Sequence, residues 1–363
     1  MKILIIGGTG ILSRAIAEEA IAKDHDVTIL TNGLGELPEP VGIKQHLICD
    51  RNQPNEFINV IKNAECKTWD LVVDAICYRA DQAQSCLAAI DAISQHTIII
   101  STAILYAPDA PMPINESAPL GNSKMLGKYG TEKTAMEQVW LNAWQTQKHP
   151  VTILRPPHIL GAGSFLGVMP FHNRDPFIIS RLLNHKPLIL ADGGKQALQV
   201  VFNRDIAKVI LAASGKSQTF GKIYNCANPE IITGAKYFEA IAQLLGVPIS
   251  IKSIPSEITE QSGWGWSATA LSRILDMSAL QRDIGIVPNT PLAIALKETI
   301  DYLPKLSHTY DKCDYSLQLD AIEQAVDQGY IELLKAVSAA SSHKERLPID
   351  QRMNIEPPNY FLR

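Results

Sequence analysis

The chain has 363 residues with 46% hydrophobic content, enough to bury a large core and long for a single doubly wound domain. A net charge of −4 without any basic run, and apolar runs well short of the ~20 residues of a membrane span, argue against nucleic acid and membrane partners. The six cysteines lie far apart without a C-x-x-C pair, so we predict no metal site and expect reduced thiols in a cytoplasmic protein.

Short apolar runs alternate with amphipathic stretches through the first half of the chain. The predicted strands are 2–6, 26–31, 44–49, 70–75, 97–101 and 151–155, and the predicted helices are 11–23, 54–65, 79–93 and 129–147. This alternation predicts an α/β fold with a doubly wound, Rossmann-type parallel sheet covered by helices on both faces.

The second half departs from this rhythm. Glycines, prolines and aromatic residues interrupt it over 161–200, sheet-like runs return at 198–203 and 221–225, and 236–246 is expected to be helical. We therefore predict a dinucleotide-binding domain and a smaller, mainly C-terminal substrate domain, followed by a helical tail extension. Their ranges are 1–160 plus about 198–229 for the first, 161–197 and 230–306 for the second, and 307–363 for the tail, with helix from about 315 to 338 broken at Gly329.

The first strand runs directly into a glycine-rich turn that opens a helix. Gly7 can adopt the backbone angles of a tight turn, Gly10 lets the main chain approach phosphates, and Ser13 is small enough for close packing of helix on strand. The N–H groups that open the helix at Ile11 offer partial positive charge to an anion. The turn therefore predicts a bound dinucleotide, held through its pyrophosphate.

The strand ends that follow leave the choice between NAD and NADP open. The second strand ends at Asn32, where neither an Asp or Glu for the ribose 2′-hydroxyl nor an Arg for a 2′-phosphate is found. We expect Asn32 to bond the ribose. Asp50 is the predicted adenine contact, because its carboxylate accepts hydrogen bonds, and a plain strand-end aspartate is the alternative. The neighbouring Arg51 is a further predicted cofactor contact.

A tyrosine and a lysine carry the predicted chemistry. Tyr129 and Lys133 are four residues apart on one predicted helix and therefore share a face. A nearby ammonium lowers the pKa of a phenol, which allows Tyr129 to take a proton from a secondary alcohol. Thr102 follows the strand 97–101 at its carboxyl end, where ligands of such sheets bind, and we expect it to fix the substrate oxygen.

With these residues the chain resembles the extended short-chain dehydrogenase/reductase family, the NAD-dependent epimerase/dehydratase group, over roughly residues 1–306. Further similar segments are 100–106, 154–156, 203–207, 274–278 and 288–292. The resemblance implies the family fold, a nicotinamide cofactor, and cofactor contacts at Pro156 and, through the nicotinamide ribose, at Lys133.

Some positions depart from that pattern. Where family members that dehydrate sugar nucleotides carry an Asp-Glu pair, this chain has Ala103 and Ile104, which cannot move protons. Leu198 and Gln199 stand where sugar-nucleotide epimerases tend to carry an arginine. His158 falls where such epimerases place a substrate contact, and a plain loop histidine is the alternative.

The sequence therefore predicts an NAD(P)-dependent oxidoreductase or epimerase that acts on a secondary alcohol or ketone, with sugars and sugar nucleotides among the candidate substrates. Thr102, Tyr129 and Lys133 are its expected catalytic residues. The alternative is a non-catalytic dinucleotide-binding sensor or assembly protein. A homo-oligomer is compatible with either hypothesis.

Overall fold

The computed structural model describes residues 1–34, 40–173, 175, 177–261, 271–303 and 314–341. Parts of the predicted substrate domain and tail, 262–270, 304–313 and 342–363, lie outside these described residues. Within the described ranges, no helix is long and apolar enough to cross a membrane.

A seven-stranded parallel sheet forms the centre of the N-terminal part. Its strands are β1 (Lys2–Ile6), β2 (Asp26–Thr31), β3 (Gln45–Ile48), β4 (Leu71–Asp74), β5 (Thr97–Ile100), β6 (Val151–Arg155) and β11 (Lys222–Asn225). They lie in the order β11-β6-β5-β4-β1-β2-β3, and every neighbouring pair is parallel. The predicted Rossmann-type sheet is confirmed, and the order reverses between β1 and β4, where ligands of such sheets bind.

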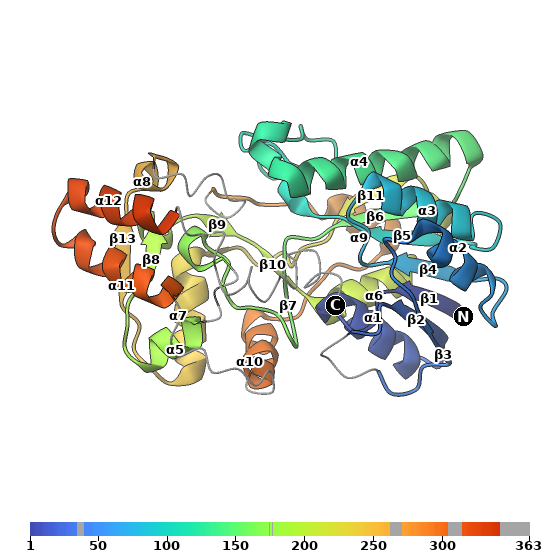
Figure 1. Cartoon of the computed structure of the whole chain (residues 1–363), viewed down its shortest axis with the longest axis horizontal. Helices are drawn as coiled ribbons and strands as arrows, with labels where there is room; N and C mark the ends of the chain where they lie inside the picture. Colours follow the sequence, from blue (N-terminus) through green and yellow to red (C-terminus); the bar gives the residue numbers. More distant parts are fainter. Residues whose placement is uncertain (35–39, 174, 176, 262–270, 304–313, 342–363) are drawn as a thin grey trace.

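Helices cover both faces of this sheet (Figure 1). One face packs against α1 (Ile11–Ala22), α6 (Asn203–Ala213) and α9 (Ser278–Ile284), and the other against α2 (Pro54–Lys62), α3 (Ala80–Ile90) and α4 (Ser123–Gln147). Alternate residues of β1 supply the two cores, because side chains of a strand point to opposite faces. Ile3 and Ile5 belong to the first core, and Leu4 and Ile6 to the second.

The rest of the chain builds a second region beside the carboxyl ends of these strands (Figure 1). Its strand pairs are β7 (His158–Leu160) with β10 (Val200–Phe202), β8 (Leu188–Ala191) with β13 (Ile251–Ile254), and β9 (Ala197–Leu198) with β12 (Ile232–Thr233). Its helices are α5 (Ile178–Leu183), α7 (Gly234–Leu245), α8 (Ser256–Gln261) and α10 (Leu292–Tyr302), and it contains the 3-10 turns Pro170–His172 and Asp192–Gly194. Two further 3-10 turns belong to the sheet part, Ala103–Leu105 after β5 and Ser217–Thr219 before β11.

The tail helices α11 (Asp314–Val326) and α12 (Tyr330–Ser341) pack on this second region, as Figure 1 shows. Ile322 and Val337 share a buried cluster with Ile254 of β13, and Arg181 of α5 bonds Asp320 of α11 at 2.9 Å. Gly329 separates the two helices with a φ of +102°, so the predicted break is confirmed.

Two element boundaries differ from the prediction. The sheet-like run 198–203 is divided at Gln199 into β9 and β10, which pair with different strands. The Gln199 side chain forms hydrogen bonds with backbone groups, donating to the Asn228 carbonyl and accepting from the Leu275 N–H. Helix α4 begins at Ser123, before the predicted start, and Gly127 interrupts it with a φ of +61°.

Candidate functional site

The turn after β1 requires glycine at two consecutive positions. Gly7 has a φ of +108°, and a Cβ there would lie 2.9 Å from the Cβ of Ser13. Gly8 has a φ of +139°, and its Cβ would lie 2.6 Å from the Cβ of Ile29. Only Gly7 was predicted to form the turn; the signal for Gly8 is the double glycine directly after a buried strand. The turn therefore packs too closely against Ser13 of α1 and Ile29 of β2 to admit a side chain at either position.

Gly10 is the N-cap of α1, and the helix starts at Ile11. The Gly10 N–H donates to the Ser13 Oγ at 3.2 Å, and the first turn of the helix carries no acidic residue. The first N–H groups of a helix lack acceptors within it and carry the positive end of the helix dipole. This arrangement suits the pyrophosphate of a dinucleotide.

The end of β2 is occupied by small polar groups. Asn32 Oδ1 accepts the Leu34 N–H at 3.1 Å, and Thr31 Oγ1 lies 2.7 Å from Nε2 of His46 on β3. Asp50, at the end of β3, is exposed and accepts the Asn52 N–H at 2.9 Å. His46 was not singled out from the sequence, although it is a polar residue in a predicted strand that leads to this edge.

The side chain of Arg51, a predicted cofactor contact, lies in the interior of the protein. Its guanidinium bonds both oxygens of Asp74, at 2.7 and 3.0 Å, and also donates to the Gln82 carbonyl. The side chains of Arg51 and Asp74 are 3% and 0% exposed. Asp74 and the Gln82 carbonyl together engage three of the five guanidinium N–H groups, so the geometry favours a structural role for Arg51 over the predicted cofactor contact.

Lys133 lies fully inside the protein at the carboxyl ends of two strands. Its ammonium donates to the Ile100 carbonyl at the end of β5, 2.8 Å away, and to the Cys77 carbonyl beyond β4, 2.7 Å away. It also lies 4.6 Å from the ring centre of Tyr78. Burial lowers the pKa of Lys133 to about 8. The ammonium is thus held in the interior of the protein, where β4 and β5 end.

Tyr129 lies one helical turn before Lys133 and is 38% exposed. Its ring centre is 6.3 Å from that of Tyr78, so both predicted catalytic residues on α4 neighbour the same ring. Tyr78 was overlooked in the sequence analysis. The available signal is its position just after the strand 70–75, at the sheet edge where ligands bind.

Thr102 begins the 3-10 turn Ala103–Leu105, directly beyond β5, and its Oγ1 accepts the Ile104 N–H at 3.3 Å. The Ala103 N–H donates to the carbonyl of Pro156, which is buried at the end of β6. Arg273 holds the other side of this turn by donating to the carbonyls of Ala103 and Tyr106, and burial lowers its pKa to about 10. Arg273 is 170 residues from Ala103 in sequence, and no sequence pattern pointed to this contact.

His158, the predicted substrate contact, lies on β7 and is partly buried. Its Nε2 is 3.1 Å from the Phe165 carbonyl oxygen, an acceptor, so this nitrogen carries the proton and donates. The bond fixes the ring orientation.

An open pocket of about 630 Å³ lies in the second region. Its lining is mostly polar and consists of Asp192, Lys195, Gln196, Ser253, Pro255 and Ser272. Gln196 is 9% exposed, and its Oε1 has no hydrogen-bond partner among the described residues. Ser272 directly precedes Arg273, so the chain connects this pocket to the turn that carries Thr102.

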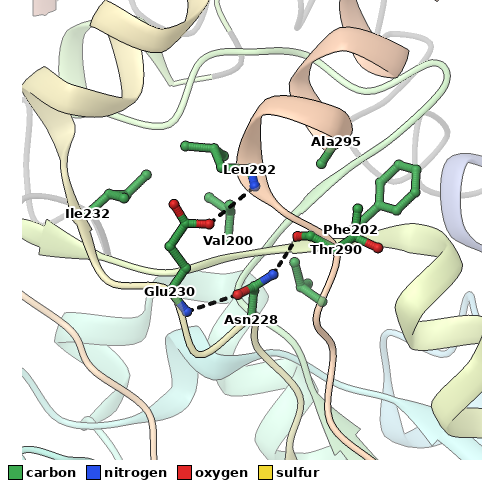
Figure 2. Close-up of a pocket in the computed structure, with 9 residues that line it drawn as sticks. Val200, Phe202, Asn228, Glu230, Ile232, Thr290, Leu292 and Ala295 are labelled. Carbon is green, nitrogen blue, oxygen red and sulfur yellow. Dashed lines mark hydrogen bonds between the residues drawn. The ribbon is translucent and has the colours of Figure 1, made fainter.

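A second, much smaller void is no candidate for a substrate site. It has a volume of about 10 Å³ and lies where Val200 and Phe202 of β10 meet the start of α10. Figure 2 shows how Glu230 and Asn228 fill the space around it, Glu230 accepting the Leu292 N–H and Asn228 donating to the Thr290 carbonyl. The volume suffices for one water molecule at most.

Comparisons with known proteins agree with this fold. A sequence model described as "NAD dependent epimerase/dehydratase family" matches residues 3–227. The chain is 26% identical over 329 residues to UDP-N-acetyl-alpha-D-glucosaminuronate decarboxylase of Bacillus cytotoxicus, covering 85% of this chain and 99% of that protein. It is 23% identical over 259 residues to chloroplast stem-loop binding protein of 41 kDa b of Arabidopsis thaliana, covering 68% of this chain and 64% of the relative.

Among solved structures, UDP-glucuronic acid 4-epimerase from Bacillus cereus in complex with NAD superposes with a TM-score of 0.66. The sequence identity is 17%, and the match covers 87% of this chain and 100% of that one.

Proposed function

Because the chain belongs to the NAD-dependent epimerase/dehydratase family, we propose that it oxidises or reduces a secondary alcohol or ketone of a sugar-type substrate through Thr102, Tyr129 and Lys133. The observation that carries the proposal is the buried ammonium of Lys133, held at the ends of β4 and β5 beside the Tyr78–Tyr129 ring pair.

The cofactor is supported by the backbone around β1. The turn at Gly7 and Gly8 has no room for a Cβ, and the first N–H groups of α1, from Ile11 onward, lack acceptors within the helix. These groups would hold the pyrophosphate. Asn32, Asp50, Pro156 and Lys133 are the further proposed contacts, with Asn32 at the adenosine ribose, Asp50 at the adenine and Lys133 at the nicotinamide ribose. When bound, NAD(P) accepts and returns a hydride.

The protein's own residues handle the proton. Tyr129 is the proposed general acid/base, because its phenol is partly exposed while its ring is anchored next to Tyr78. Lys133 supplies a fixed positive charge that favours the phenolate. Thr102 is held by the turn that Pro156 and Arg273 fix, and it would hydrogen-bond the reacting oxygen.

The pocket lined by Asp192, Lys195 and Gln196 is the proposed place for the rest of the substrate. Its carboxylate, ammonium and amide suit a ligand rich in hydroxyl groups, such as a sugar or the sugar part of a nucleotide sugar. Leu198 is 4% exposed and lies in an apolar cluster, so it supplies no cation to a phosphate. The sugar-nucleotide substrates named for the relatives support the same substrate class, and His158 is the further proposed contact.

The test pairs a substrate screen with one variant. Purified protein is incubated with NAD or NADP and a panel of sugars, sugar nucleotides and small ketones, and products are followed by chromatography and nicotinamide absorbance. We expect Tyr129→Phe to bind NAD normally by calorimetry and to turn over the identified substrate about 10²–10⁴-fold more slowly. Tyr330→Phe, on the tail helix α12, is the matched control and should behave as wild type.

Wild-type turnover by Tyr129→Phe would refute the mechanism. Tight NAD binding without turnover across the whole panel would favour the alternative, a dinucleotide-binding sensor or assembly protein.

A further inference from the structure

The Lys133 ammonium is buried and has no carboxylate partner among the described residues. An ammonium has three N–H groups, and two of them are used by the carbonyls of Cys77 and Ile100. The ammonium also lies over the ring of Tyr78, whose face attracts cations, 4.6 Å from the ring centre. In the described part of the chain, Lys133 forms no ion pair.

The charged groups near Lys133 are already paired with one another. Asp74 at the end of β4 is bonded by Arg51, and Glu137 on α4 is bonded by Arg155 at 2.9 Å. The Cys77 thiol is buried, and burial raises its pKa to about 12, so it stays neutral. The position of the Lys133 charge is therefore set by two carbonyls and one aromatic ring.

Tyr78 is itself held rigidly. It directly follows Cys77, its N–H donates to Gln82 Oε1 at 2.8 Å, and its side chain is nearly buried. Its ring is tilted by 47° against that of Tyr129. One fixed ring thus neighbours both the ammonium and the phenol that the proposed mechanism couples.

We infer that Tyr78 is a positioning residue, whose ring face holds the Lys133 ammonium against the two carbonyls and so keeps its charge beside Tyr129. The inference rests on the proposed function, since it assigns Tyr78 a role in that chemistry. It also specifies that the aromatic face acts and that the Tyr78 hydroxyl does not. Without the ring, the lysine side chain can rotate toward water, and the phenol loses its fixed positive neighbour.

The experiment follows the Tyr129 phenol directly and requires no substrate. Protein labelled with ¹³C at the Cζ of tyrosine is titrated by NMR, and the signal missing in Tyr129→Phe identifies Tyr129. We expect Tyr78→Phe to keep the wild-type titration midpoint of this signal. Tyr78→Leu, which keeps apolar volume but removes the ring, should move it upward by about one pH unit.

A double-mutant cycle tests whether Tyr78 acts through Lys133. Lys133→Met should raise the midpoint as well, and Tyr78→Leu in the Lys133→Met background should add little, because the charge is already gone. Circular dichroism and urea denaturation check that each variant is folded.

The possible results distinguish a failure of the Tyr78 role from a failure of the proposed function. If Lys133→Met raises the midpoint while folded Tyr78→Leu leaves it unchanged, the role of Tyr78 is refuted and the proposed function stands. An equal shift in Tyr78→Phe and Tyr78→Leu would assign the effect to the hydroxyl and overturn the inference. If Lys133→Met has no effect on Tyr129, the proposed coupling fails and the inference fails with it.

Discussion

Replacing Arg51 with methionine tests whether its charge serves the cofactor or the core. In the structure the guanidinium makes two bonds to Asp74, whose side chain is 0% exposed. In Arg51→Met the carboxylate keeps the Ile76 N–H, at 3.1 Å, and the weak hydrogen bond from the buried Cys86 thiol, but no cation. Removing one partner of a buried ion pair typically costs about 3–5 kcal/mol, since the other charge stays buried.

Urea denaturation followed by circular dichroism measures this loss. The double variant Arg51→Met/Asp74→Leu removes both charges, and its unfolding free energy should return to within about 1–2 kcal/mol of wild type. The matched control is Arg79→Met, because Arg79 pairs with Asp81 at the surface and such pairs contribute about 1 kcal/mol or less. Folded Arg51→Met should bind NAD with unchanged affinity by calorimetry. Wild-type stability combined with lost NAD binding would refute the structural assignment and restore the cofactor contact.

Three further results are expected. Gly10→Val should abolish NAD binding with little loss of fold, because its side chain would occupy the approach to the phosphates, and retained micromolar affinity by calorimetry would contradict the cofactor site. Because Asn32 is neutral, competition binding should show a preference between NAD and NADP of about tenfold or less, and a hundredfold preference would reveal an overlooked anchor. Burial lowers the pKa of His96 from 6.5 to about 4, so the unfolded state binds more protons between these values. Stability should therefore fall by up to about 3 kcal/mol as the pH drops from about 6.5 to about 4, with a shallower urea-midpoint profile in His96→Gln.

The parallel sheet and the glycine-rich turn after β1 could be predicted from the sequence, because both depend on residues that are neighbours in the chain. Short continuous apolar runs predicted β1, β2 and β6, and Gly7 was recognisable because glycine tolerates such a turn. The i and i+4 spacing likewise placed Tyr129 and Lys133 one turn apart on α4 before any coordinates were known.

Only the tertiary structure decided which partners the polar groups have. Lys133 bonds carbonyls 33 and 56 residues away, Arg51 reaches Asp74 across 23 residues, and Arg273 secures the turn of Thr102 from 170 residues away. These partners depend on which strand ends lie side by side at the sheet edge and which loop covers that edge. The pattern of neighbouring residues does not contain this information, which is why Arg51 was predicted as a cofactor contact although it forms a buried ion pair.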